Sequence, residues 1–161
     1  MQRQNLFTDE PWDSEEGGPE TGLAHRTFWR PNNARMGATL WELCPGAEGM
    51  RWHMHYGAEE MFFVLSGRPV FRTMKGKEEL APGDFVFCPE GRAGLHAYGN
   101  PHAEPARILA MSAGSYPDVV AYPEHEYAWV ATRVPELPPG DDPGIIARFD
   151  FRLDRPDDRV S

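Results

Sequence analysis

Cysteine is scarce in this sequence of 161 residues. Only Cys44 and Cys88 are present, and neither belongs to a Cys-x-x-Cys pair. Each ends an apolar run just before a proline, so we expect two small buried thiols in a reducing compartment. A disulfide or a reactive thiol is the alternative. Cysteine therefore offers little for redox or metal chemistry.

Long hydrophobic runs and an excess of basic residues are also missing. The run Met61 to Leu65 is as long as any in the chain, far short of the roughly 20 residues that span a bilayer. The first residues lack the apolar centre of a signal peptide, so we expect a cytoplasmic protein without membrane contact. Sixteen Lys and Arg oppose 25 Asp and Glu, giving a net charge of −9 with no basic patch. Nucleic acid is therefore not an expected partner.

Glycine and proline are abundant, with sixteen of each, and they separate short apolar stretches. These stretches recur about every ten residues, and none shows a sustained helical period, which predicts an all-β sandwich or barrel with little or no helix. The stretches lie at about 36–43, 60–65, 69–74, 84–88, 94–98 and 106–111.

The ends of the chain differ from its centre. Residues 8–20 hold six acidic residues and no basic one, so we assign 1–26 to an acidic N-terminal arm. Residues 27–134 form the predicted barrel domain. The remainder, 135–161, comprises a Pro- and Gly-rich spacer, an alternating strand at 145–153 and a tail.

Chemistry-bearing side chains gather in two short stretches. In a strand, His53 and His55 point to one face while Met54 points to the other, which is chelate spacing. Glu60 begins the next strand and can close back on the pair, and His96 supplies a third imidazole. Three imidazoles and one carboxylate suit a divalent transition metal, namely Zn, Mn, Fe, Ni, Co or Cu. Core imidazoles satisfied by hydrogen bonds are the alternative.

Both stretches resemble the two motifs of the cupin superfamily. Residues 45–67 hold a glycine, His-x-His, a glutamate and a closing glycine, and residues 82–100 hold Gly, Pro-x-Gly, His and Asn. The resemblance implies a double-stranded β-helix, a jelly-roll barrel, with a metal at the bottom of a one-ended pocket. It also implies the metal ligands, which are His53, His55, Glu60 and His96. Glu59 competes with Glu60, but only Glu60 stands at the usual distance before Gly67.

A narrower resemblance is to small single-domain bacterial cupins with no assigned reaction. It is carried by Glu59 to Gly67, by Pro89 to His96 and by Pro117 to Pro123. Those relatives usually continue the last stretch with Asp-Ser and a Lys, whereas this chain continues with Glu124-His125-Glu126.

Two further side chains are candidates to orient a substrate. Arg51 shares strand parity with His53 and His55, and Tyr98 shares it with His96, so both are expected to face the cavity. A guanidinium could hold a carboxylate there, and a phenol could donate a hydrogen bond or a proton. The alternatives are a solvent-facing Arg51 and a packing role for Tyr98.

The other histidines, His25, His102 and His125, lack a second ligand at chelating spacing and are expected in surface or loop positions.

Two functional hypotheses follow. The first is an enzyme that uses the metal as a Lewis acid or O2 site on a small substrate, as an oxygenase, isomerase, decarboxylase or lyase. The second is a non-catalytic protein that binds or senses a small molecule such as a sugar.

A homodimer is also predicted, from three features. These are the strand 61–65, apolar on both faces, the aromatic residues in the acidic arm, and the one-faced strand 145–153.

Overall fold

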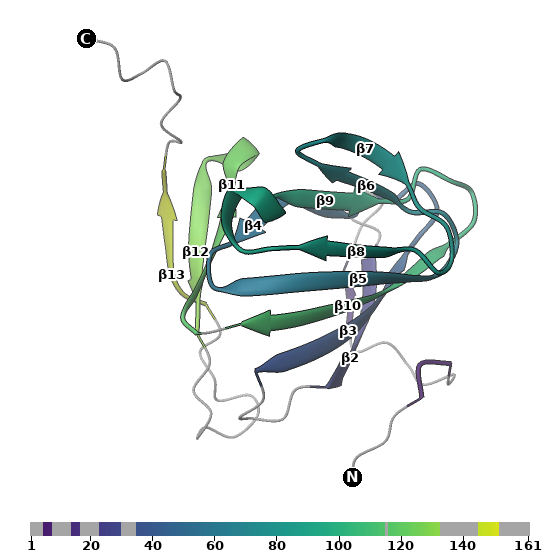
Figure 1. Cartoon of the computed structure of the whole chain (residues 1–161), viewed down its shortest axis with the longest axis horizontal. Helices are drawn as coiled ribbons and strands as arrows, with labels where there is room; N and C mark the ends of the chain where they lie inside the picture. Colours follow the sequence, from purple (N-terminus) through teal and green to yellow (C-terminus); the bar gives the residue numbers. More distant parts are fainter. Residues whose placement is uncertain are drawn as a thin grey trace.

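The structure is a computed structural model that describes residues 5–7, 14–16, 23–29, 35–114, 116–132 and 145–151. Two antiparallel sheets face each other as a jelly-roll barrel (Figure 1). The first sheet has the order β1-β2-β3-β10-β5-β8. Its strands are β1 (Ser14–Glu16), β2 (Leu23–Trp29), β3 (Met36–Leu43), β10 (Ala106–Gly114), β5 (Ala58–Ser66) and β8 (Phe85–Cys88).

The second sheet has the order β13-β12-β11-β4-β9-β6-β7 and carries most of the candidate ligands. Its strands are β13 (Ile145–Asp150), β12 (Tyr127–Ala131), β11 (Asp118–Tyr122), β4 (Met50–His55), β9 (His96–Gly99), β6 (Val70–Thr73) and β7 (Gly76–Glu79).

Helix is limited, in the described ranges, to the 3-10 turns η1 (Gly91–Gly94) and η2 (Pro123–His125). The prediction of an all-β jelly-roll barrel is therefore confirmed. No helix among the described residues is long and apolar enough to cross a membrane.

A hydrophobic core fills the space between the two sheets at one end of the barrel. Its largest members are Phe62 on β5, Phe71 on β6, Tyr98 on β9 and Ile108 on β10. Each is almost fully buried, so this part of the interior is closely packed.

A second apolar cluster lies on the outer face of the second sheet. Trp52 and Met54 on β4 pack there with Leu95, Ala121 and Ala128. Both faces of this sheet therefore carry packed side chains, which matters for the sites described below.

A β-bulge interrupts β4 directly before the histidine pair. Met50 pairs with Tyr98 and His53 pairs with His96, so three steps along β4 match two steps along β9. The extra residue reverses the alternation of faces. Met50 therefore packs against the inner core, like the inward-facing His53, while Arg51 is exposed.

The terminal strands add to the two sheets rather than standing apart. β1 and β2 extend the first sheet beside β3, and β13 pairs with β12 in the second. The predicted strand at 145–153 thus pairs within its own chain. The rest of the 8–20 arm, the spacer and the tail lie outside the described residues, and the domain boundaries stay predictions.

The two cysteines are both free. Cys88 is buried, as expected, but Cys44 is exposed, so the prediction of a buried thiol is wrong for Cys44. Cys44 lies directly after the last residue of β3 and begins a turn, because its carbonyl oxygen accepts a hydrogen bond from the Ala47 N–H.

Candidate metal centre

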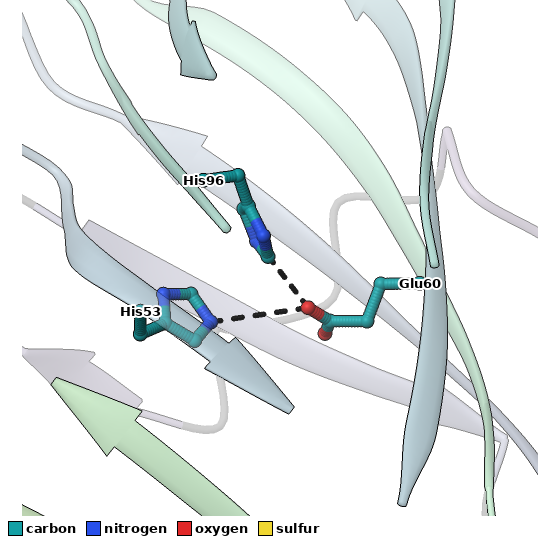
Figure 2. A group of neighbouring side chains, drawn as sticks. All are labelled: His53, Glu60 and His96. Carbon is teal, nitrogen blue, oxygen red and sulfur yellow. Dashed lines mark ion pairs between the residues drawn. The ribbon is translucent and has the colours of Figure 1, made fainter. Parts of the chain in front are cut away.

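Three strands bring a histidine and carboxylate group together inside the barrel. His53 comes from β4, His96 from the neighbouring β9, and Glu60 from β5 in the opposite sheet. Figure 2 shows both imidazoles pointing at the Glu60 carboxylate. One possible ligand atom from each of these three residues lies within 4.8 Å of the other two.

The distances identify the atoms that converge. Glu60 Oε2 lies 3.8 Å from His53 Nε2, and 3.3 Å from Nε2 of both His55 and His96. His55 is outside the tightest group, yet its ring is directed at the same oxygen. All four residues predicted as ligands are therefore gathered around one point.

A hydrogen bond at the far nitrogen fixes each imidazole. His53 Nδ1–H donates to the Arg51 carbonyl oxygen at 2.7 Å, and His96 Nδ1–H donates to the Gly94 carbonyl oxygen at 2.8 Å. His55 Nδ1–H donates to Asp118 Oδ2 at 2.6 Å. Because these acceptors require a proton on Nδ1, the three Nε2 lone pairs face Glu60.

Two of the converging atoms have no hydrogen-bond partner. Glu60 Oε2 and His96 Nε2 are buried and make no hydrogen bond in the described structure. Leaving buried acceptors unpaired is costly. A divalent cation bound between them would satisfy both, so the donor set fits a metal of the predicted kind.

Electrostatics also favour ligation by two of the rings. Burial, followed by repulsion from the neighbouring imidazoles, holds the pKa of His53 well below its usual value. Burial is likewise the main cause of the lowered pKa of His96. These two rings are therefore neutral at neutral pH, the state in which an imidazole binds a metal.

His55 behaves differently. Burial alone would lower its pKa, but the hydrogen bond to Asp118 and the charges of Glu60 and Asp118 outweigh it and raise the pKa. The Asp118 carboxylate is thus part of the site, since it fixes the His55 ring and makes it more basic.

Of the candidate substrate-orienting residues, the structure brings only Tyr98 near this group. Its ring is buried in the inner core and lies 6.3 Å from the His96 ring. Burial, with the nearby charge of Glu60 second, raises its pKa well above the usual value. Tyr98 therefore remains a neutral phenol.

Arg51 lies elsewhere. The bulge turns it to the outer face of the second sheet, where it is exposed and lines a separate pocket. The parity argument assumed an unbroken strand from Arg51 to His55, and the extra residue breaks it. An orienting role for Arg51 at the metal stays a prediction that this position does not favour.

The remaining candidate residues lie at or near the surface, or their side chains lie outside the described part of the chain. Glu59 is exposed, whereas Glu60 turns inward. His125 is exposed, and half-buried His102 bonds to Glu79 at 2.7 Å. The side chain of His25 lies outside the described part of the chain.

Sequence reasoning missed Asp118 and Tyr122, which lie on β11. Asp118 is 63 residues from His55, so no local spacing connects the two. Tyr122 stacks on the His53 ring at a centroid distance of 5.5 Å. The stretch 117–123 was singled out only by resemblance, and the alternation of Asp118, Val120 and Tyr122 on one strand face is the signal that could have found them.

Comparison with known proteins shows which class of protein this fold and site resemble. Residues 39–112, a little under half of the chain, match the model of the cupin domain. This match and the jelly-roll fold make the chain similar to proteins of the cupin superfamily. No curated protein matches the sequence significantly.

Several solved structures are similar to this chain. A protein from Acidithiobacillus ferrooxidans, provisionally described as a sugar phosphate isomerase, shares 33% identity at a TM-score of 0.55. That match covers 59% of this chain and 60% of the other, less than two thirds of either. The protein TT1209 from Thermus thermophilus shares 26% identity at a TM-score of 0.57, covering 71% and 98%.

A cupin-superfamily sugar phosphate isomerase from Silicibacter pomeroyi is similar in fold. It shares 21% identity at a TM-score of 0.67, and the match covers 82% of this chain and 80% of the other. At that identity the similarity shows the fold alone.

Proposed function

We propose that this protein is a cupin and a metal-dependent enzyme acting on a small oxygen-bearing substrate, with isomerisation of a phosphorylated sugar as the favoured reaction. The observation that carries the metal is the convergence of three imidazole Nε2 atoms on Glu60 Oε2. A metal is further favoured because two buried atoms at this point, Glu60 Oε2 and His96 Nε2, have no hydrogen-bond partner among the described residues.

His53, His55, Glu60 and His96 would hold a divalent Zn, Mn, Fe, Ni, Co or Cu ion. Bound there, the ion would supply Lewis-acid polarisation of a substrate carbonyl or hydroxyl oxygen. Four protein ligands would leave room on such an ion for substrate oxygens.

The surrounding side chains would position the substrate and exclude water. Tyr122 covers one side of His53 and stacks on Tyr127 at 4.8 Å. Trp129 packs edge-on against Tyr122, and its indole N–H meets no acceptor among the described residues. Tyr98, protonated throughout the physiological range, can donate a hydrogen bond but cannot act as a base.

The substrate class is supported by the relative from Acidithiobacillus ferrooxidans. It is provisionally described as a sugar phosphate isomerase and shares 33% identity over the matched region. This likeness favours isomerisation over the oxygenase, decarboxylase and lyase reactions that the ligand set alone leaves open.

Metal content tests whether the protein binds a metal, which the enzyme and the binding hypotheses both assume. The purified protein is incubated with each of the six metals, desalted and analysed by mass spectrometry for metal per chain. We expect close to one ion per chain for the wild type and at least a tenfold loss in His53→Ala. His102→Ala, which removes an imidazole that bonds to Glu79 outside the candidate metal centre, should keep the ion. A wild type that retains no metal, with unchanged thermal stability when metals are added, would overturn the proposal.

Turnover tests the reaction. Aldose and ketose phosphates are incubated with the metal-loaded protein, and interconversion is followed by NMR alongside O2 uptake. Interconversion that disappears in His53→Ala supports the isomerase. Binding of sugar or sugar phosphate without turnover would instead identify the non-catalytic binder, and O2 consumption would identify an oxygenase.

A further inference from the structure

A cavity of about 740 Å³ lies apart from the metal centre. We call it the outer pocket and define it by Arg51, Trp52, Val70, Arg72, Lys77 and Ala97, with the turn 46–49 and η2 at its rim. None of His53, His55, Glu60 and His96 lines it. Its volume falls within the range of small-molecule sites.

The outer pocket and the metal centre occupy opposite faces of the same sheet. On β9, His96 turns inward and Ala97 outward, and on β6, Phe71 turns inward while Val70 and Arg72 line the pocket. Trp52 follows the same rule on β4, directly before the inward-facing His53. In Figure 1 the β6–β7 hairpin stands beside β9, so these strands form one continuous wall.

The pocket concentrates positive charge in a chain whose net charge is −9. Arg72 and Lys77 are directly opposite each other in the β6–β7 ladder and line the same cavity. A like-charged cross-strand pair destabilises a hairpin. Arg51 adds a third cation, and among the described residues neither Arg51 nor Lys77 has a carboxylate partner.

Arg72 is held in place before any ligand arrives. Its guanidinium lies 4.1 Å from the centre of the Trp52 ring and 2.7 Å from Glu124 Oε1. Glu124 and Glu48 are the carboxylates at the pocket, against three permanent cations. The balance favours an anion, and the fixed fork of Arg72 suits the paired oxygens of a carboxylate or phosphate.

The lining is not only charged. Val70, Ala97 and the indole of Trp52 give the cavity an apolar side next to its cations. An inorganic anion alone would leave that side uncovered, whereas a ring or short hydrocarbon attached to the anion would cover it.

We propose that the outer pocket is a second ligand site, for a small organic anion in which a carboxylate or phosphate is attached to an apolar or planar body. Arg51, Arg72 and Lys77 bind the anion, and Trp52 with Val70 and Ala97 contacts the body. This site is independent of the metal and of the reaction proposed for the inner face.

Calorimetry with simple probes tests the site. Phenyl phosphate and benzoate carry the two anions on one ring, inorganic phosphate lacks the ring, and benzyl alcohol lacks the charge. We expect one site per chain for an aromatic anion, at least tenfold weaker binding of inorganic phosphate, and none of benzyl alcohol. The stronger of the two aromatic probes identifies the preferred anion.

Variants locate the binding. Arg51→Gln and Lys77→Gln should each weaken it at least fivefold and together at least twentyfold. Arg107→Gln removes an arginine that pairs with Glu42 on the first sheet and should leave binding within twofold. His53→Ala, which removes a metal ligand, should also leave it within twofold, with or without a chelator.

Two results would overturn the proposal. One is the absence of saturable binding of either aromatic anion at 10 mM probe. The other is binding that survives Arg51→Gln/Lys77→Gln but is lost in His53→Ala, which would place the probe at the metal centre. Because His53→Ala also reports on metal loading, failure of the outer pocket and failure of the proposed enzyme give different patterns.

Discussion

Asp118 shows how one carboxylate orients a proposed metal ligand, His55, that belongs to another strand. It accepts a hydrogen bond from His55 at 2.6 Å and another from the Gly57 backbone N–H at 2.8 Å. Burial alone would raise the pKa of Asp118, but these hydrogen bonds and the charge of His55 lower it. Asp118 therefore stays ionised, and it would act on the candidate metal centre through His55.

Neutralising Asp118 should weaken metal binding without removing a ligand. Loss of a carboxylate that supports a ligating histidine typically costs 10–100-fold in metal affinity. We expect Asp118→Asn to lose about tenfold and Asp118→Ala closer to 100-fold, measured by competition with a chromophoric chelator. Asp84→Asn, which neutralises an exposed aspartate bonded to Ala81, is the matched control. Wild-type affinity in Asp118→Ala would contradict this positioning role.

At the scale of elements, the turn between β3 and β4 depends on two glycines with the same backbone angle. Gly46 and Gly49 both have φ of +75°. A Cβ on Gly46 would meet nothing within 4 Å, whereas one on Gly49 would collide with the Tyr98 carbonyl oxygen and lie 2.8 Å from Gly99 Cα. The backbone of β9 thus approaches this turn too closely for any side chain at Gly49.

This pair separates backbone strain from steric contact. Gly46→Ala should cost about 1 kcal/mol of the free energy of unfolding, the penalty of a left-handed alanine. Gly49→Ala should cost about 2 kcal/mol more, because β9 must also shift. Urea unfolding measures both. An equal loss of unfolding free energy in the two variants would show that the close approach of β9 to Gly49 does not add to the cost of the substitution.

Strands with an apolar face were predictable, and a strand without one was not. The apolar stretch at 36–43 coincides with β3, and those at 60–65, 84–88 and 106–111 fall within one residue of β5, β8 and β10 or inside them. β7 reads Gly-Lys-Glu-Glu and is exposed at every position. It exists because β6 offers it a hydrogen-bonded edge, and tertiary pairing of that kind leaves no hydrophobic period.

The same distinction divides the candidate site. His53, His55, Glu60 and His96 were found because their spacing is local or motif-bound. Arg51 was predicted to face the cavity because no residue in this stretch of sequence indicates a bulge. Its position depends on how β4 pairs with β9, and that pairing becomes visible only in three dimensions.

At the scale of the whole molecule, the outer face of the first sheet presents aromatic side chains to solvent. Phe85 and Phe87 on the edge strand β8 are each 53% exposed, and the Phe63 ring lies 6.2 Å from that of Phe85. Exposed aromatics along an unpaired edge mark a contact surface. A second copy, related by a two-fold axis, could pair β8 with its own counterpart and bury both rings.

The homodimer is accordingly expected to depend on β8. We expect light scattering to give twice the 18.2 kDa chain mass, and Phe85→Ser/Phe87→Ser to shift it toward one. Met74→Ser, which removes a large apolar side chain exposed to 55% on the β6–β7 turn, should remain dimeric. A wild type that is monomeric at every concentration tested would refute the prediction. The strand 145–153, now paired with β12, no longer supports it.

The bulge in β4 has a consequence for how tolerance to mutation should be distributed along that strand. In a regular strand with one site on each face, substitutions at successive positions would alternately affect the metal centre and the outer pocket. Here the phase slips once between Met50 and His53, so a saturation scan should record two consecutive positions, Arg51 and Trp52, with the outer-pocket phenotype. Deleting one of these two codons would remove the bulge, so that the faces alternate without interruption from Met50 to His53 and both of these side chains still point inward.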